Sequence, residues 1–395
     1  MCGRTGRQHE AFASGLIQSI GSIRRVQQDA ALRATPRDYH QRLEAMVVVW
    51  IAFLLFIFFL LALDLGVFHR KAHVVSVREA LTWTCVWVTL ALAFSGFVYL
   101  AYENQWFGLG MMPDPVDRSA AFPNGRINDG WSAFLKFITG YVVEESLSVD
   151  NVFVIAMLFQ YFAVPREYQH RVLFWGIIGA VAMRGLMIAI GAQLVAQFSW
   201  VLLVFGGILI LTAIKMAFFT SEEVDPAQNF IIRKIQRKFP VTDRFHGEHF
   251  FIKESRGWML TPLALALVMV ETTDLIFAVD SIPAIFAITA DPFLVFTSNV
   301  FAILGLRSLY FALAGALHTL RYMKHALAAV LLVVGVKMLA HEPIEDALGE
   351  NFNLYLLGVV LTILAIGVVA SLLHRTGKAT SHTSSAAAAD LKSTK

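Results

Sequence analysis

Charged residues and cysteines are both scarce in this chain. Asp, Glu, Lys and Arg make up 15% of its 395 residues, whereas hydrophobic residues make up 57%. Soluble domains have about a quarter of their residues charged, so this composition indicates a polytopic membrane protein. The two cysteines, Cys2 and Cys85, are too few for a disulfide framework or a thiolate metal site. A formal net charge of +3 is too small to indicate a nucleic acid partner.

Long apolar runs predict the fold class, an all-α polytopic membrane protein of about nine transmembrane helices. The predicted spans lie roughly at 46–67, 83–102, 131–162, 172–196, 199–219, 258–288, 294–316, 326–341 and 353–373.

Lys and Arg are unevenly distributed between the loops. The loops after spans 1, 3, 5 and 7 hold three, two, seven and two of them, and the loops after spans 2, 4, 6 and 8 hold two, none, none and none. Basic loops face the cytoplasm. We therefore expect a multi-pass protein of the plasma (inner) membrane with a cytoplasmic C-terminus.

The segments outside the spans differ in composition from the membrane domain, 46–375. Residues 1–45 are basic, and we expect either a disordered extension or a misassigned start, with Met46 as the true one. The cytoplasmic loop 220–257 contains an apolar stripe that predicts a short amphipathic helix on the inner face, formed by Ile231, Ile232, Ile235 and Phe239. Residues 376–395 are rich in Ser, Thr and Ala and are predicted to be disordered.

Acidic residues inside the apolar runs are the main functional signal. The run 270–289 carries Glu271, Asp274 and Asp280, followed by Pro283. A charged group near the bilayer centre costs at least ~2.5 kcal/mol, so such residues generally have a partner or a function. The stretch therefore indicates a site that handles a cation.

A second acidic stretch, 141–151, resembles the first. When the two Val-Asp pairs are aligned, Asp150 matches Asp280 and Asn151 matches Ser281, while Glu144 matches Asp274. In each half an Arg and then a Lys follow at similar spacing, namely Arg184 and Lys215 in the first half and Arg307 and Lys337 in the second. The pattern predicts two three-helix repeats, 131–219 and 258–341.

Each repeat has an odd number of spans, so the two repeats should insert with opposite orientation. Inverted repeats are characteristic of secondary transporters, which bind substrate near the membrane midplane between the repeats.

Helix geometry limits how these acids can meet. Residues six apart lie on different faces of a regular helix, so Glu144 and Asp150 cannot both point inward, nor can Asp274 and Asp280. Either a helix is irregular near Asp150 or Asp280, or one acid of each pair faces a neighbouring span. We expect at least one irregular helix, because Pro283 removes a backbone donor after Asp280.

Carboxylate and hydroxyl oxygens suit hard divalent cations such as Mn²⁺, Mg²⁺ or Ca²⁺. The candidate metal ligands are therefore oxygen-bearing side chains of the two acidic stretches: Glu144, Asp150, Asn151, Glu271, Asp274, Asp280 and Ser281.

The nearby cations have alternative roles. For Arg184 and Arg307 we favour neutralisation of buried acids over contact with substrate. Lys215 and Lys337 lie near span ends, where extension to the interface and buried pairing are both open. Asp64, at the end of span 1, is either interfacial or part of the site.

The sequence resembles the TerC/Alx integral membrane proteins in five stretches: LLALDLGVFHRK (60–71), FITGYVVEESLSVDNVFV (137–154), RVLFWGIIGAVAMRG (171–185), VETTDLIFAVDSIPAIFAITADPF (270–293) and TSNVFAILGLRSLYF (297–311). The resemblance covers roughly residues 46–375. It implies a place in the superfamily of LysE-type exporters, manganese efflux or tellurium resistance as the function, and Mn²⁺ binding by Glu144, Asp150, Glu271, Asp274 and Asp280.

We therefore expect a secondary exporter of Mn²⁺ that exchanges the metal for protons, with no permanent cofactor and no enzymatic activity. The expected partners are the divalent ion, protons and the lipid bilayer. The alternatives are a membrane scaffold of tellurium resistance or a stress response, and an intramembrane aspartyl hydrolase, which no motif supports.

Overall fold

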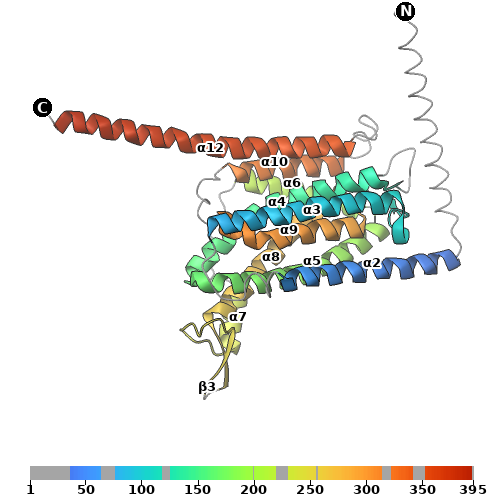
Figure 1. Cartoon of the computed structure of the whole chain (residues 1–395), viewed down its shortest axis with the longest axis horizontal. Helices are drawn as coiled ribbons and strands as arrows, with labels where there is room; N and C mark the ends of the chain where they lie inside the picture. Colours follow the sequence, from blue (N-terminus) through green and yellow to red (C-terminus); the bar gives the residue numbers. More distant parts are fainter. Residues whose placement is uncertain are drawn as a thin grey trace, which may run out of the picture.

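The computed structural model describes residues 36–63, 76–117, 125–198, 200–218, 230–254, 257–313, 322–340 and 352–393. Long helices form a bundle in which most of them run roughly along one direction (Figure 1). In chain order the elements are α2 (Pro36–Leu63), α3 (Val77–Glu103), η2 (Trp106–Gly108), β1 (Pro113–Asp114), β2 (Arg126–Ile127), α4 (Gly130–Tyr161), α5 (Arg166–Gln197), α6 (Val201–Phe218), α7 (Phe230–Lys238), β3 (Phe251–Glu254), β4 (Gly257–Leu260), α8 (Pro262–Phe286), α9 (Pro292–Leu313), α10 (Met323–Leu339) and α12 (Phe352–Ser393).

Helix α9 is the most buried of the described candidate membrane spans. Its apolar window is 94% buried, and it packs against α3, α4 and α5. Aromatic side chains fill one side of this contact, with the rings of Phe94 and Phe301 centred 4.7 Å apart. On the other side Gly140 lets α4 approach α9, because a Cβ there would lie 2.9 Å from the Ser298 hydroxyl.

Helix α8 lies beside α4, α5 and α6, and α10 packs between α6 and α12 (Figure 1). Glycines permit two of these contacts. A Cβ on Gly191 of α5 would lie 2.7 Å from the ring of Phe286, and Gly206 and Gly335 let α6 and α10 pack closely. Because α8 and α9 lie among the helices of the first predicted repeat, one acid of each stretch, Glu144 or Asp274, faces a shared interior.

Helix ends are set by side-chain caps. Asp129 accepts from the backbone N–H of Ser132 at 2.8 Å and begins α4. Thr261 caps α8, whose first residue is a proline. Asp291 accepts from the backbone N–H of Phe293 at 3.0 Å and caps α9. Such caps satisfy N–H groups that have no partner within the helix.

All nine predicted spans correspond to described helices. Seven of these helices are long and apolar enough to cross a membrane: α2 from Glu44, α3, α5, α6, α8, α9 and α12 to Leu373. The other two predicted spans correspond to α4, which carries several charges, and to α10, which has 17 residues. The chain is thus an all-α membrane protein with at least seven candidate spans in its described part.

The prediction of an irregular helix at the acidic stretches is wrong. Helix α4 is continuous through Asp150, and α8 is continuous through Asp280 and Pro283 to Phe286. Pro283 lies within the last turn of α8, where its missing N–H removes a single helical hydrogen bond. The alternative, that one acid of each pair faces another helix, describes the structure.

Two segments outside the spans differ from expectation. Helix α2 begins at Pro36, ten residues before Met46, and the remainder of 1–45 lies outside the described residues. Helix α12 continues to Ser393 instead of giving way to a disordered tail at residue 376. The four alanines 386–389, which have the highest helix propensity, favour this continuation.

In the loop 220–257, the predicted amphipathic helix is present as α7. Ile235 of α7 packs against buried apolar residues of the protein rather than facing outward. The hairpin of β3 and β4 was not predicted, because its two strands of four residues are too short to give a clear alternating pattern.

Candidate functional site

Four helices bring polar side chains together around Arg184 of α5. The guanidinium forms an ion pair with Glu144 of α4 through Nη1. It binds both carboxylate oxygens of Asp274 of α8, with Nη2–Oδ1 at 2.9 Å and Nε–Oδ2 at 3.2 Å. Nη1 also donates to the Ser281 hydroxyl at 3.3 Å and to the side-chain oxygen Oδ1 of Asn299, on α9, at 3.0 Å. We call these five residues the Arg184 cluster.

The Arg184 cluster is buried within the bundle. The side chain of Glu144 is 0% exposed and that of Arg184 is 2% exposed, whereas the Asp274 side chain is 12% exposed. Two carboxylates face one guanidinium, so the cluster carries one uncompensated negative charge when both acids are ionised. Burying such charges costs several kcal/mol per ion, which good geometry and extra hydrogen bonds offset.

Asp280 and Asp150 lie away from the Arg184 cluster, as helix geometry requires for residues six apart. Asp280 accepts a hydrogen bond from the Thr212 hydroxyl of α6 at 2.9 Å and interacts with the charge of Lys215. Asp150 interacts with the charge of Lys324, near the start of α10. Each pair of acids is therefore divided between the shared interior and a neighbouring helix.

Glu271 lies one helical turn before Asp274 and points toward α5. Its carboxylate occupies the space that a side chain on Gly179 would take, since a Cβ there would lie 2.0 Å from Oε1. Oε2 of Glu271 is buried with no hydrogen-bond partner. Glu271 is thus close to the Arg184 cluster but outside its hydrogen bonds.

The remaining predicted residues are also distributed around the interior. Asn151 and Arg307 are buried at 4% and 6% exposure. Lys337 is buried as well and donates to the carbonyl of Ala287, just after α8, at 2.5 Å. Its ammonium also lies 5.3 Å from the ring centre of Phe352. Asp64 lies outside the described residues.

The ligand types in the Arg184 cluster suit a hard divalent cation, but the cation position is taken by the guanidinium. Among the described residues no three His, Cys, Asp or Glu side chains come together in a group that could hold a metal ion. Glu144, Asp274, Ser281 and Asn299 supply oxygens from three helices. Metal binding at this place requires Arg184 to move away.

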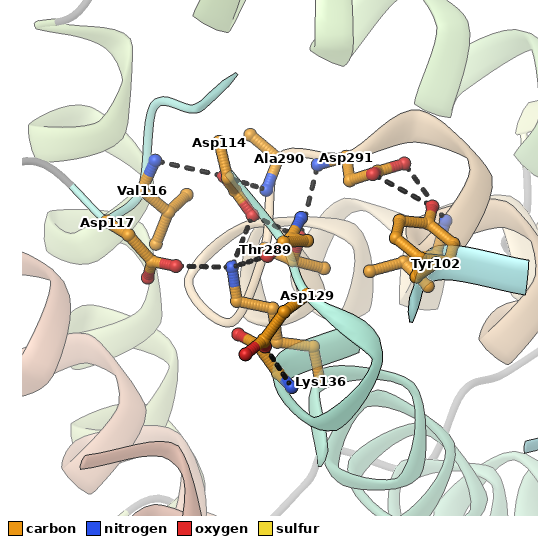
Figure 2. A network of polar contacts seen from close by, with 12 residues as sticks. Tyr102, Asp114, Val116, Asp117, Asp129, Lys136, Thr289, Ala290 and Asp291 are labelled. Atoms are coloured by element: carbon orange, nitrogen blue, oxygen red, sulfur yellow. Dashed lines mark hydrogen bonds and ion pairs between the residues drawn. The ribbon is translucent and has the colours of Figure 1, made fainter. Parts of the chain in front are cut away.

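A second buried network lies where α4 begins and α8 gives way to α9 (Figure 2). At its centre is Lys136 of α4, fully buried, whose ammonium contacts Asp114 at 2.7 Å and Asp117 at 2.5 Å and donates to the side-chain carbonyl of Asn128 at 2.6 Å. We call Lys136, Asp114, Asp117 and Asn128, together with Thr289 and Ala290, which donate to Asp114, the Lys136 network.

Asp114 joins the loop between α3 and α4 to the turn after α8. It accepts from the Thr289 hydroxyl at 2.5 Å and from the backbone N–H of Ala290 at 2.9 Å. Next to it, the Tyr102 hydroxyl of α3 donates to Asp291 at 2.9 Å (Figure 2). One network thus ties α3, α4, α8 and α9 together at this end of the bundle.

The pKa values of the three aspartates of this region are shifted in different directions. Burial would raise the pKa of Asp114, but the charge and hydrogen bond of Lys136 lower it to about 2. Burial raises the pKa of Asp117, despite the charge of Lys136. Burial also raises the pKa of Asp291, and the negative charge of Asp114 adds to the effect. Asp114 is therefore the ionised partner of Lys136 at neutral pH.

The sequence reasoning missed Lys136, Asp114, Asp117 and Asn299. A lysine in the apolar run FLKFITG and an asparagine in TSNVFAIL were available as signals, since buried polar groups need partners. The partners of Lys136 lie in a loop whose path the sequence does not reveal.

Comparison with known proteins gives a consistent result. Residues 129–379 match the family described as "Integral membrane protein TerC family". The "Uncharacterized membrane protein STKORF319" of Myxococcus xanthus is 45% identical over 325 residues, which cover 82% of this chain and 92% of the relative. The "Putative membrane-bound redox modulator Alx" of Escherichia coli (strain K12) is 40% identical over 319 residues, 80% of this chain and 94% of the relative. No solved structure matches the chain.

Proposed function

Because the chain belongs to the integral membrane protein TerC family, we propose that it is a secondary transporter that exports a divalent cation, Mn²⁺, in exchange for protons. The observation that best supports this proposal is that Glu144 and Asp274 both pair with Arg184. These acids come from helices α4 and α8, occupy matched positions in the two predicted repeats, and converge on one buried point beside two neutral oxygen ligands.

Arg184 acts in this proposal as the internal cation that holds the site while substrate is absent. Exchanging one guanidinium for one Mn²⁺ brings the charge of Glu144 and Asp274 to zero, so the metal compensates the buried acids better than the arginine does. The arginine also reduces the repulsion between the two carboxylates. Carboxylates that lose Mn²⁺ and bind protons supply the coupling.

Inverted repeats are part of the same proposal. Helix α5 runs parallel to α8, since Gly176 lies against Val270 and Gly191 against Phe286. Helix α4 runs parallel to α9, since Gly140 lies against Ser298 and the ring of Phe159 lies 5.5 Å from that of Tyr310. With α4 and α5 joined by a short turn, these directions support opposite orientations of α4 and α8. We count α4 and α10 among nine spans on this ground.

The proposed location is the inner membrane with a cytoplasmic C-terminus. Basic residues concentrate in the loops after α2, α4, α6 and α9. In this proposal the further acids of α4 and α8, namely Asp150, Glu271 and Asp280, pass the cation and protons to and from the Arg184 cluster.

The test is the manganese content of cells that lack the protein and then receive it or a variant. We expect the parent protein to lower cellular Mn and the variants Glu144→Gln, Asp274→Asn, Asp150→Asn and Asp280→Asn to lose most of this effect. Asp243→Asn, which changes an exposed acid, serves as the matched control and should act like the parent. Variants that export as well as the parent would show that the site is misassigned.

A scaffold in tellurium resistance or a stress response is the second candidate. Its supporting observation is that Glu144 and Asp274 are already paired with Arg184, as purely structural charges would be. Mn²⁺ binding by purified Arg184→Gln protein separates the two functions. If the acids form a transport site, Arg184→Gln removes the competing cation, and the variant should bind Mn²⁺ more tightly than the parent. If the acids form only a structural ion pair, the variant should bind no Mn²⁺ and should be less stable than the parent.

A further inference from the structure

Residues 230–254 and 257–260 form an arm that is attached to the bundle by specific contacts. Arg171 of α5 forms an ion pair with Glu248 at 2.5 Å and lies over the ring of Phe250. The Thr261 hydroxyl at the start of α8 donates to the carbonyl of His249 at 2.8 Å. Within the arm, the backbone N–H of Leu260 donates to the carbonyl of Pro240, which joins the end of α7 to β4. These contacts fix the direction of the arm.

The hairpin of this arm projects sideways from the bundle, at the end where α5 and α8 begin (Figure 1). Its strands run roughly across the direction of the long helices (Figure 1). Because spanning helices lie close to the membrane normal, a segment that extends across them lies along the membrane surface.

One face of the hairpin is aromatic and exposed. In the antiparallel register Phe251 pairs with Leu260 and Lys253 pairs with Trp258, so these four side chains share a face. Phe251 is 60% exposed and Trp258 is 67% exposed, whereas Ile252 and Met259 on the opposite face are partly buried. Large aromatic side chains in this arrangement are typical of membrane interfaces.

The arm is also basic. Residues 230–260 contain seven Lys or Arg against three Asp or Glu, a net charge of +4. Arg237 and Lys238 at the end of α7 are exposed, and so is Lys253 between the two aromatic residues. Positive charge beside aromatic side chains matches the surface of a leaflet that contains anionic lipid.

We propose that this arm is a membrane-surface anchor, in which Phe251 and Trp258 insert into the interface and Lys253, with Arg237 and Lys238, binds anionic phospholipid headgroups. The anchor holds α7 and the start of α8 against the membrane. It rests on the proposed transmembrane orientation of the bundle, but it does not depend on the identity of the transported ion.

The test uses full-length protein in nanodiscs made from equal amounts of phosphatidylcholine and phosphatidylglycerol, with benzoylphenylalanine in place of Trp258. After illumination, mass spectrometry identifies the cross-linked molecules. We expect lipid adducts in which phosphatidylglycerol predominates. Lys253→Gln should lower the ratio of the two adducts by up to about fivefold. Arg78→Gln, which removes an exposed charge at the start of α3, should leave the ratio unchanged.

Cross-links to protein alone, or equal labelling of both lipids, would overturn the proposal. Because nanodiscs have no cytoplasmic side and no transport is measured, neither result bears on Mn²⁺ export. A Lys253→Gln protein that loses lipid preference while cells still lower their Mn content would separate the anchor from the transport site.

Discussion

Replacing Lys136 by methionine tests whether the Lys136 network holds the bundle together. The ammonium is fully buried and has three side-chain partners, Asp114, Asp117 and Asn128, within 2.7 Å. Removing one member of a buried ion pair costs about 3–5 kcal/mol, because the remaining charge has no counterion. Asp114 keeps its hydrogen bonds to Thr289 and Ala290, so the expected cost is about 3 kcal/mol, at the lower end of this range.

The assay is thermal unfolding of the purified protein in detergent. With about 2 °C per kcal/mol for a chain of this size, Lys136→Met should lower the apparent melting temperature by about 6 °C. Lys238→Met, which removes an exposed lysine of α7, should change it by less than about 1 °C. A shift for Lys136→Met as small as that of the control would refute the reasoning.

A double variant and the pH dependence make this test specific to the ion pair. In Lys136→Met/Asp114→Asn the uncompensated charge of Asp114 is gone, so the double variant should be more stable than Lys136→Met alone. In the parent, Asp114 has a pKa lowered to about 2, so its stabilising contribution persists until the pH falls through that value. Without Lys136 the pKa of Asp114 rises. The difference in stability between the parent and Lys136→Met should therefore become smaller as the pH falls from neutrality toward about 4. A deficit independent of pH would argue against buried charge as its cause.

Two further predictions concern single contacts. Gly179→Ala places a Cβ where the Glu271 carboxylate lies, so we expect it to abolish Mn²⁺ export in the cellular assay. The double variant Gly179→Ala/Glu271→Asp should recover part of the export, because the shorter aspartate side chain leaves room for the Cβ. Equal export by the parent and Gly179→Ala would contradict the close approach of Glu271 to Gly179. Tyr102→Phe removes the hydrogen bond to Asp291 at 2.9 Å and should lower the free energy of unfolding by about 1.5–3 kcal/mol. We expect the apparent melting temperature to fall by about 3–6 °C. An unchanged melting temperature would show that this hydrogen bond adds no stability.

The pairing of Glu144 and Asp274 with Arg184 could be anticipated in part, because the predicted repeat supplied information that a single helix could not. Matching Glu144 with Asp274 placed the two acids in equivalent positions, and the spacing of Arg184 marked it as a charge partner. The helical period also predicted that Asp274 and Asp280 could not share one face of a regular helix, and Asp280 instead contacts Thr212 of α6. The preference for an irregular helix was wrong, because a proline in the last turn disturbs little of α8. Instead, one acid of each pair faces a neighbouring helix.

The Lys136 network could not be predicted, for a different physical reason. Its pairs join residues 19 and 22 positions apart, and its contact with Thr289 spans 175 positions. Periodicity governs regular helices, whereas a loop takes its path from the partners that it finds after the helices have packed. Lys136 could have been recognised as a buried charge in need of a partner, but the identity of the partner depends on the tertiary structure.

The Arg184 cluster and the Lys136 network connect the same two helices, α4 and α8, so the Lys136 network bears on the proposed transport. Lys136 and Glu144 lie eight residues apart on α4, about 12 Å along its axis. Asp274 lies on α8, and Thr289, which Asp114 holds, lies in the turn that follows that helix. Any shift of α8 against α4 that releases Arg184 must therefore strain the Lys136 network, which holds the two helices together at one end. Lys136→Met should consequently change the rate of Mn²⁺ export more than the affinity of the purified protein for Mn²⁺, measured at a temperature where the variant is folded. An equal loss of affinity and rate would indicate that Lys136 acts on the site itself and not on the movement of α8.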